Sequence, residues 1–322
     1  MLGVRQRARL IYNPSSGKEL LRNKLATMLD ILEEGGWETS CHATKSESDA
    51  VDAASFAAAD GYECVIAAGG DGTIHSVVNG LAKAPQRPAL GIIPAGTSND
   101  LARALGLPRQ LEEACRVIVE RRTRPMDIGV SGDTFFVNIA GCGRMTELTY
   151  DVPSKLKTVL GQLAYFVKGL ELLPMLRSIQ LHIESPNFNF SGEAMLCLIG
   201  NTSIVGGFTR LLPDASMNDG LLDVILVKQV GLPELVRLTT LAMRGEHVTS
   251  DRVVYVQTPE VSVWSDDPVD LNLDGEYGGM LPRKFSVLKH HLQVIVGADS
   301  MVERPAKSGL SLNESAQALN ER

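Results

Sequence analysis

The stretch from Cys64 to Gly80, CVIAAGGDGTIHSVVNG, constrains the fold more than any other part of the sequence. An apolar run typical of a buried strand meets two glycines, a carboxylate, a third glycine and a hydroxyl, and a helix-like run follows. Glycines after a strand let the backbone approach a ligand closely, because no Cβ is in the way. The helix that begins there offers unpaired N–H groups and the positive end of its dipole, which favours a phosphate group as the ligand.

Asp71, in the middle of this turn, leaves two interpretations open. A carboxylate repels phosphate, so Asp71 suits a phosphate site if it acts through a metal ion or its waters, or if it orients a ribose or a lysine. The alternative is a plain glycine-rich turn in which Asp71 and Thr73 only cap the helix. The turn matches neither the Walker A pattern nor the G-x-G-x-x-G pattern, so these residues alone do not decide between the two.

Strand-like and helix-like stretches alternate over the first ~130 residues, which predicts a parallel sheet with helices on its faces. The expected strands are RARLIY, residues 37–44, YECVIAAGG, ALGIIPAGT and RPMDIGVS, and a helical stretch is expected from SNDLARALGL to about Arg122. Ligands bind outside the carboxyl ends of such strands. The polar turns NPSSGK, ATKSES, GGDGT and PAGTSND each follow a strand, so they are expected to gather at one edge of the sheet.

After about Gly129 the pattern changes to short strand-like runs, among them TFFVNIAG, FNFSGEAMLCLIGN, RVVYVQTPEVSVW and VDLNLDGEYGG. They predict a second, mainly β domain with antiparallel pairing, interrupted by helices near 154–173 and 232–243. The length of 322 residues suits two domains. We expect an α/β domain over 1–128, a β-rich domain over 129–304, and a flexible polar tail over 305–322.

Composition narrows the function classes. The net charge of −7 and the lack of interleaved basic and aromatic residues give no support for nucleic-acid binding. Five scattered cysteines without a C-x-x-C pair favour a reducing cytoplasm over a disulfide framework. No apolar run approaches the ~20 residues that span a bilayer, so any membrane contact is expected at the surface.

The motifs NPSSGK, GGDGT, PAGTSND, MDIG, PDASMNDG and LDGEYGG occur in the order seen in the diacylglycerol kinase catalytic-domain family. The segment YDVPSKLKTVLGQLAYFVKGLELLP is similar to soluble bacterial members of that family, and the resemblance covers about residues 7–297. GGDGT alone is shared with NAD kinases and, loosely, with phosphofructokinases. The resemblance implies that 1–128 form an ATP-binding α/β domain like that of NAD kinases or phosphofructokinases. It also implies that 129–304 form a β-sandwich-like lipid-substrate and metal domain, with the active site between the two domains.

The resemblance also assigns residues. It implies a Mg²⁺ ion held by the Asp219 carboxylate and the carbonyls of Ser216 and Leu221. It implies a water network through Asp71, Asp100 and Asp127 that reaches a catalytic magnesium, and Glu276 as the general base. The implied ATP site comprises Asn13, Pro14, Ser15, Ser16, Gly17, Thr44, Gly69, Gly70, Asp71, Gly72, Thr73, Ile74, His75 and Thr97. His75 is a departure, because relatives commonly carry Asn at that position.

Without the resemblance, the residues of the second domain leave these roles open. PDASMNDG fits a Mg²⁺ loop, because one carboxylate and inward-facing carbonyls suit that ion, and it fits a plain turn before a strand equally well. Glu276 by itself reads as an ordinary exposed hairpin residue.

The expected function is ATP- and Mg²⁺-dependent phosphorylation of diacylglycerol to phosphatidate, which returns diacylglycerol to phospholipid synthesis. The alternatives are a kinase for another lipid alcohol such as a sphingoid base or ceramide, an NAD kinase, and a nucleotide-binding regulatory protein without turnover. The expected partners are ATP, diacylglycerol and anionic phospholipid, in a cytoplasmic homodimer at the inner face of the membrane. The segment 153–174, with Lys155, Lys157 and Lys168, is the candidate membrane contact.

Overall fold

The computed structural model describes residues 6–17, 19–143, 178–297 and Ala316. The chain divides into two compact units, one of Met1–Ile128 with Lys289–Arg304 and one of Gly129–Leu288 with Pro305–Arg322. The first unit thus includes residues that the sequence analysis assigned to a 129–304 domain. The reason is that β15 (Arg283–Ile295) runs past Leu288 and pairs in parallel with β4 (Ala89–Pro94) through Val294 and Leu90. The predicted tail over 305–322 lies, except for Ala316, outside the described residues.

The first unit contains a parallel sheet with strand order β4-β3-β1-β2, as predicted for the first four strands. The fifth expected strand, RPMDIGVS, lies outside this order, because it forms β5 (Thr123–Ser131) and pairs with β15 and with β6 (Thr134–Phe136). All three pairings within this order are parallel, so the carboxyl ends of the strands lie at one edge. Buried apolar residues fill β3 and most of β4, as expected for strands covered on both faces. The strands are β1 (Gln6–Tyr12), β2 (Trp37–Ala43), β3 (Cys64–Gly69) and β4 (Ala89–Pro94).

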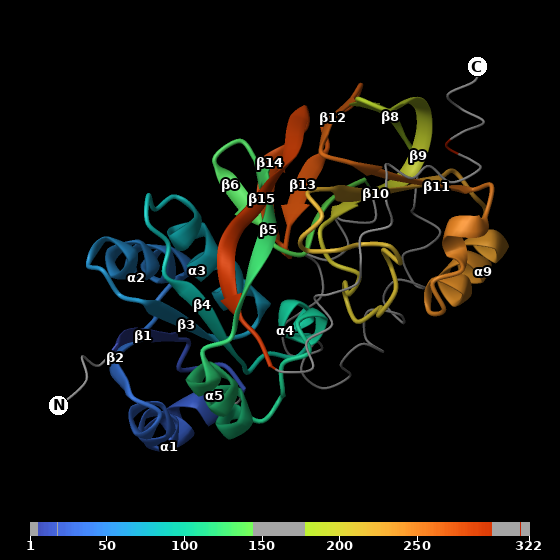
Figure 1. Cartoon of the computed structure of the whole chain (residues 1–322). Coiled ribbons are helices and arrows are strands. Elements are labelled where there is room, and N and C mark those ends of the chain that lie inside the picture. The colour runs from blue at the N-terminus through green and yellow to red at the C-terminus, as the bar shows by residue number, and fades with distance from the viewer. Residues whose placement is uncertain (1–5, 18, 144–177, 298–315, 317–322) are drawn as a thin grey trace. The chain divides into compact units, whose positions relative to one another are not determined.

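Helices cover both faces of this sheet (Figure 1). On one face α1 (Leu20–Glu34) and α5 (Leu111–Glu120) share a buried apolar cluster with the strands. On the other face lie α2 (Glu47–Ala59) and α3 (Asp71–Ala82), which pack closely because Gly80 leaves room for the backbone of α2. The unit therefore has the doubly wound α/β architecture that the sequence predicts.

The helical stretch predicted from SNDLARALGL to Arg122 is wrong as one element. The chain forms α4 (Asp100–Ala104) and, after a break, α5. Gly106 adopts a left-handed φ of 67°, and Pro108 has no N–H to donate to a helix, so the helix ends before them.

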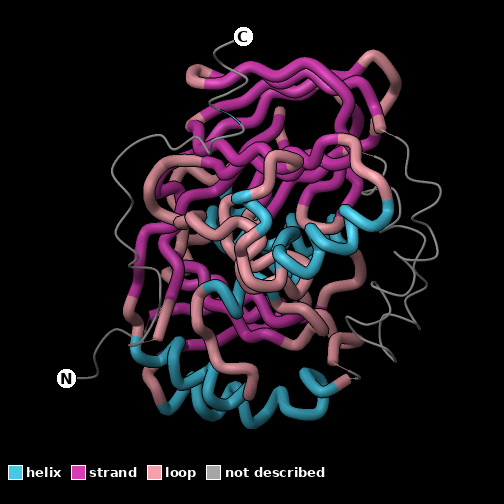
Figure 2. The backbone as a smooth tube through the Cα atoms, turned by 90° about the vertical axis from the view of Figure 1, so that its right-hand side faces the viewer, coloured by secondary structure: helices cyan, strands magenta, loops and turns pink. Residues whose placement is uncertain are grey.

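The second unit is built mainly from antiparallel strands, as predicted, and Figure 2 shows how strands dominate it. Two predicted strands are each split in two: TFFVNIAG gives β6 and β7, and RVVYVQTPEVSVW gives β11 and β12 on either side of Pro259. The elements are the end of β5 (Thr123–Ser131), β6 (Thr134–Phe136), β7 (Ile139–Cys142), β8 (Ile179–Ser185), β9 (Phe188–Gly200), β10 (Leu222–Lys228), α9 (Leu232–Ala242), the 3₁₀ turn η2 (His247–Thr249), β11 (Val253–Thr258), β12 (Glu260–Ser265), β13 (Asp270–Leu273), β14 (Glu276–Met280) and the first half of β15.

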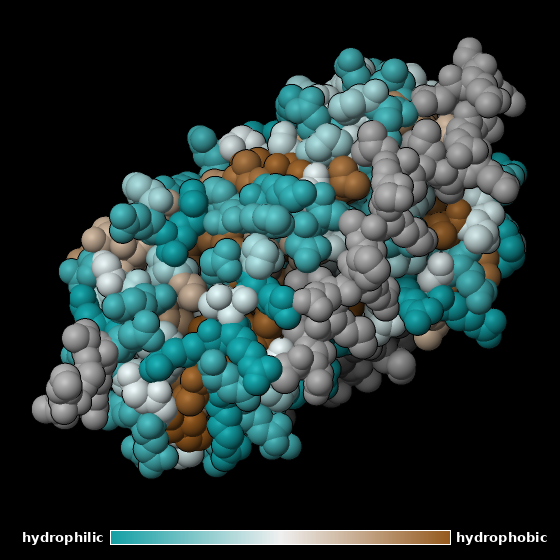
Figure 3. Space-filling model, in the orientation of Figure 1, coloured by the Kyte–Doolittle hydropathy of each residue, from teal (hydrophilic) through white to brown (hydrophobic). Residues whose placement is uncertain are grey.

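Inward-facing residues of these strands form the core of the second unit, with Phe136 and Phe285 in edge-to-face contact at 6.3 Å between ring centroids. On the face that Figure 3 shows, the described surface is mostly hydrophilic and carries several apolar patches. Among the described residues, no helix is long and apolar enough to cross a membrane.

Candidate functional site

A polar cavity of about 360 Å³ lies in the first unit, where β1 and β2 end and α2 and α3 begin. It brings together part of the predicted ATP site, namely Asn13, Pro14, Ser15, Thr44, Gly72 and Thr73. Ile74 and His75 are buried in α3 and do not line this cavity, and His75 lies 3.3 Å from the Asn79 side chain. The other lining residues are Lys45, Ser46 and Glu47 of the predicted ATKSES turn, and Ala50 and Ser76, which were not among the predicted site residues.

The turn after β1 is held in shape by its own side chains. The Asn13 Oδ1 atom accepts hydrogen bonds from the Ser15 backbone N–H at 3.0 Å and from the Ser15 hydroxyl at 2.8 Å. Gly17 adopts a left-handed φ of 61°, and a Cβ there would lie 3.1 Å from the Ala95 carbonyl oxygen. The NPSSG turn therefore lies against the PAGT turn, which confirms that these two turns meet at one edge of the sheet.

Asp71 joins the GGDGT turn to the PAGTSND turn. Its two carboxylate oxygens accept the backbone N–H groups of Asn99 at 2.9 Å and Asp100 at 2.7 Å. The approach is close: a Cβ on Gly96 would lie 2.6 Å from the Gly70 Cα, so Gly96 cannot carry a side chain without a backbone shift. Asp71, at the start of α3, thus holds the two turns in a fixed position relative to each other.

Asn99 is a residue of this site that sequence reasoning missed. It adopts the left-handed conformation with φ 51° and ψ 49°. Its Oδ1 atom accepts the Gly96 N–H at 2.8 Å, and its Nδ2 atom donates to the Gly96 carbonyl at 2.8 Å. Asn tolerates this backbone region better than most residues, so Asn before Asp in PAGTSND was the available signal.

The three predicted network carboxylates have different surroundings. Asp100 contacts Asp71 through its backbone, and its side chain lies 3.9 Å from the Arg103 guanidinium. Asp127 is fully buried in β5, where its carboxylate accepts the backbone N–H of His290 at 2.6 Å. Asp71 and Asp100 are thus in direct contact, whereas a water network through all three stays a prediction.

The predicted Mg²⁺ loop of the second unit is a tight turn before β10. The Leu221 N–H donates to the Asp219 carboxylate at 2.9 Å, and Gly220 between them has a φ of 81°. The Ser216 hydroxyl donates to the Asn218 side chain at 2.8 Å. No group of three or more His, Cys, Asp or Glu side chains that could hold a metal occurs in the described parts of the chain. The expected set has one carboxylate and two carbonyls, an all-oxygen donor set that suits Mg²⁺.

A buried carboxyl group that was not predicted from the sequence lies in β10, the strand that follows this loop. Asp223 is fully buried and accepts hydrogen bonds from the Tyr255 hydroxyl and from the Gln257 amide, the latter at 3.0 Å. Burial raises the pKa of Asp223 to about 8, and the charges of Asp219 and Asp214 add to this effect. Asp223 is therefore mostly protonated and uncharged at neutral pH, so the negative charges near this loop come from Asp214 and Asp219.

Glu276 stands at the start of β14, paired with Leu273 of β13 across a two-residue turn. Its side chain is partly exposed. The second unit therefore presents Glu276 on an ordered hairpin, in agreement with the hairpin predicted from LDGEYGG.

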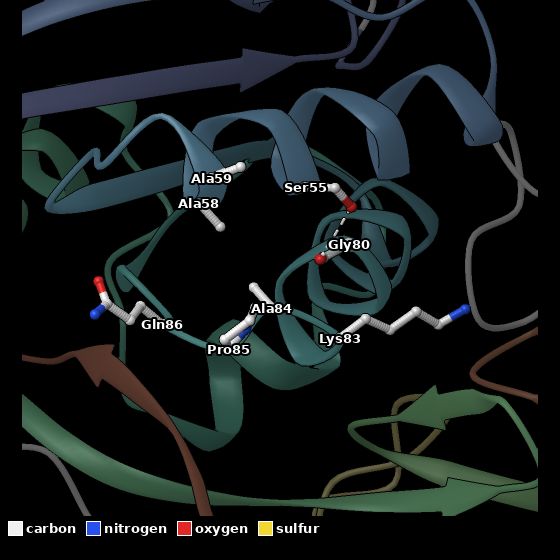
Figure 4. A pocket seen from close by; sticks show the side chains of 8 residues that line it. All are labelled: Ser55, Ala58, Ala59, Gly80, Lys83, Ala84, Pro85 and Gln86. Carbon is white, nitrogen blue, oxygen red and sulfur yellow. Dashed lines mark hydrogen bonds between the residues drawn. The ribbon is translucent and has the colours of Figure 1, made fainter.

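A second cavity of about 410 Å³ in the first unit carries none of the predicted site residues. It lies between α2 and the end of α3 and is lined largely by small residues (Figure 4). Its one charged lining residue, Lys83, extends away from the other lining side chains, so no set of polar groups converges on a ligand there. The polar cavity is therefore the better candidate for a nucleotide.

Comparison with known proteins agrees with this architecture. Residues 7–131 match the family model described as the diacylglycerol kinase catalytic domain, and residues 148–296 match the YegS C-terminal NAD kinase beta sandwich-like domain. Diacylglycerol kinase of Bacillus subtilis (strain 168) is 51% identical over 90% of this chain and 96% of the relative. The enzyme of Staphylococcus haemolyticus (strain JCSC1435) is 45% identical over 92% of this chain and 90% of that relative.

A crystal structure described as a diacylglycerol kinase from Bacillus anthracis str. Sterne covers 91% of this chain and 98% of its own, at 25% identity and a TM-score of 0.76. The sandwich-like second domain expected from the sequence is thus borne out by both the strand pairing and the family model. On this sequence identity and coverage, the chain belongs to the diacylglycerol kinase family.

Proposed function

We propose that this kinase transfers the γ-phosphoryl group of ATP to the free hydroxyl of diacylglycerol in a Mg²⁺-dependent reaction that yields phosphatidate. The observation that carries the proposal is the joined pair of turns at Asp71, beside a polar cavity, in a chain of this family. Helix N-termini and glycine-rich turns suit a polyphosphate, and α3 begins at Asp71 with Gly70 as its N-cap.

The predicted site residues would bind the nucleotide and two Mg²⁺ ions. The NPSSG and GGDGT turns would hold the nucleotide phosphates through backbone N–H groups, and Thr44 and Thr73 would orient the nucleotide from the cavity wall. A bound Mg²⁺ would neutralise charge on the phosphates during transfer. Asp71, Asp100 and Asp127 would hold its waters, whereas Ser216, Asp219 and Leu221 would hold a separate Mg²⁺.

Glu276 would act on the lipid side. Its carboxylate would orient the diacylglycerol hydroxyl and accept the hydroxyl proton as the new O–P bond forms. Because the transition state of phosphoryl transfer is loose, the position of this carboxylate matters more than its base strength.

The lipid substrate lies in a bilayer, so the enzyme has to reach a membrane surface. We assign this contact to segment 153–174, with anionic phospholipid as the partner of Lys155, Lys157 and Lys168, and this segment lies outside the described residues. A homodimer at the inner face of the membrane is part of the same proposal and rests on the family resemblance. Vesicle co-sedimentation at low and high salt tests the first point, and sedimentation velocity tests the second.

The substrate is tested by incubating purified protein with labelled ATP, Mg²⁺ and a panel of diacylglycerol, a sphingoid base, ceramide and NAD in mixed micelles. The expected labelled product is phosphatidate. Labelled sphingoid phosphate, ceramide phosphate or NADP in its place would identify another substrate. ATP binding without a labelled product from a folded protein would indicate a regulatory protein.

A further inference from the structure

Glu276 is separated from β13 by the two-residue turn Asp274–Gly275, in which both residues have positive φ values of 52° and 100°. Two consecutive residues with positive φ are the signature of a tight hairpin turn, and glycine suits the second position. Asp at the first position is a non-glycine residue in an uncommon conformation, so the surrounding contacts have to hold it there.

Those contacts converge on the Asp274 carboxylate. One oxygen accepts the backbone N–H of Val137 at 2.8 Å, and the other accepts the N–H groups of Asn138 at 2.8 Å and Ile139 at 2.9 Å. The backbone N–H of Asp274 donates to the Ile139 carbonyl at 2.8 Å. On the other side of the turn, the Asn272 side chain accepts the Gly275 N–H at 2.8 Å.

The segment that receives Asp274 is itself fixed. The Asn138 carbonyl accepts the Asn201 backbone N–H at 2.9 Å, and the Asn201 side chain donates to the Val137 carbonyl at 3.3 Å. Val137 is 1% exposed and Asn138 5% exposed, so water competes little for these groups. The turn is therefore anchored to the core of the second unit by the three hydrogen bonds of the Asp274 carboxylate, together with the bond from the Asp274 backbone N–H.

We propose that Asp274 is a positioning residue for the reaction, which fixes the turn so that the Glu276 carboxylate meets the lipid hydroxyl. The proposal rests on the role proposed above for Glu276. Asp274 acts on the hydroxyl only through the backbone of Gly275 and Glu276, so it is not itself a catalytic residue. A displacement of about 1 Å at a reacting group can lower a rate by about 10²-fold, which sets the effect to expect from releasing the turn.

The test compares Asp274→Asn with Asp270→Asn, which makes the same chemical change on the same hairpin but away from the turn. In Asp274→Asn the amide NH₂ faces backbone donors and cannot accept from them. We expect kcat for diacylglycerol to fall by about 10²-fold, with the ATP KM unchanged, and Asp270→Asn to behave as wild type. Amide hydrogen exchange of Val137, Asn138 and Ile139 should become faster in Asp274→Asn alone.

A double variant separates positioning from general loss of structure. Asp274→Asn combined with Glu276→Gln should be no slower than Glu276→Gln alone, because the turn has no base left to position. If Asp274→Asn does not fold, Asn272→Ala loosens the same turn through one hydrogen bond and should show a smaller loss of kcat.

Three results would overturn the inference: full activity in folded Asp274→Asn with faster amide exchange, additive losses in the double variant, or full activity in Glu276→Gln. The first two leave the proposed kinase function intact. A wild-type protein that binds ATP and phosphorylates no lipid would refute the proposed function itself.

Discussion

Replacing Asp71 by Ala tests whether its carboxylate holds the two turns of the nucleotide side together. The side chain accepts the N–H groups of Asn99 and Asp100, which are 4% and 8% exposed and therefore largely shielded from water. Hydrogen bonds to a charged acceptor contribute about 1.5–3 kcal/mol each, so the loss of both would cost about 3–6 kcal/mol. Water that enters the freed space would accept hydrogen bonds from some of these N–H groups, so we expect the lower end of this range.

The assay is thermal unfolding followed by circular dichroism, with Asp52→Ala as the control. Asp52 is an exposed carboxylate on α2 in the same unit. A loss of about 3 kcal/mol lowers the melting temperature of a domain of this size by about 6–12 °C, whereas the control should shift little. If Asp71→Ala and Asp52→Ala have the same melting temperature, the Asp71 carboxylate does not hold the two turns together. Phosphoryl transfer should also fall by several orders of magnitude, and near-normal turnover would refute the assigned role in the metal network.

Three further predictions concern the second unit. Glu276→Gln keeps the side-chain shape and should lower kcat by about 10²–10⁴-fold with ATP binding unchanged, while a loss confined to ATP affinity would make Glu276 a nucleotide residue. Asp219→Asn should raise the Mg²⁺ concentration needed for activity and weaken the stabilisation by Mg²⁺ in thermal unfolding, and an unchanged titration curve would count against this metal site. Burial lowers the pKa of His247 below its usual 6.5, because the folded state favours the neutral imidazole. The contribution of this histidine to the free energy of unfolding is therefore complete above pH 6.5, and it is lost as the pH falls through the lowered pKa of the folded state. The free energy of unfolding by denaturant should therefore fall between pH 8 and pH 5, and it should fall less in His247→Gln. An equal fall in that variant would exclude His247 as the cause.

The two fold classes could be predicted from the sequence because they depend on local patterns. Alternating strand and helix signals lead to a parallel sheet, and short strand runs lead to antiparallel pairing. The end of α4 was not predicted, although Gly106 and Pro108 are residues that commonly end a helix. The helical pattern on both sides of them favoured one continuous helix.

Contacts between segments that are far apart in the sequence could not be predicted. The sequence pattern places a carboxylate in the GGDGT turn, but that Asp71 accepts two N–H groups 28 and 29 residues away follows only from the packing of β3 beside β4. Asp223 and Tyr255 are 32 residues apart and meet because β10 and β11 pair in register. For the same reason Asp274 appeared to be a turn residue, although its carboxylate binds a segment about 135 positions earlier.

The most direct test of the central claim is a product balance with purified protein, ATP, Mg²⁺ and diacylglycerol in mixed micelles. ADP is measured enzymatically and the lipid product by mass spectrometry. The proposed reaction predicts one phosphatidate for each ADP, with neither formed when diacylglycerol or Mg²⁺ is left out. ADP formed without phosphatidate, or no turnover by folded protein that binds ATP, would contradict it.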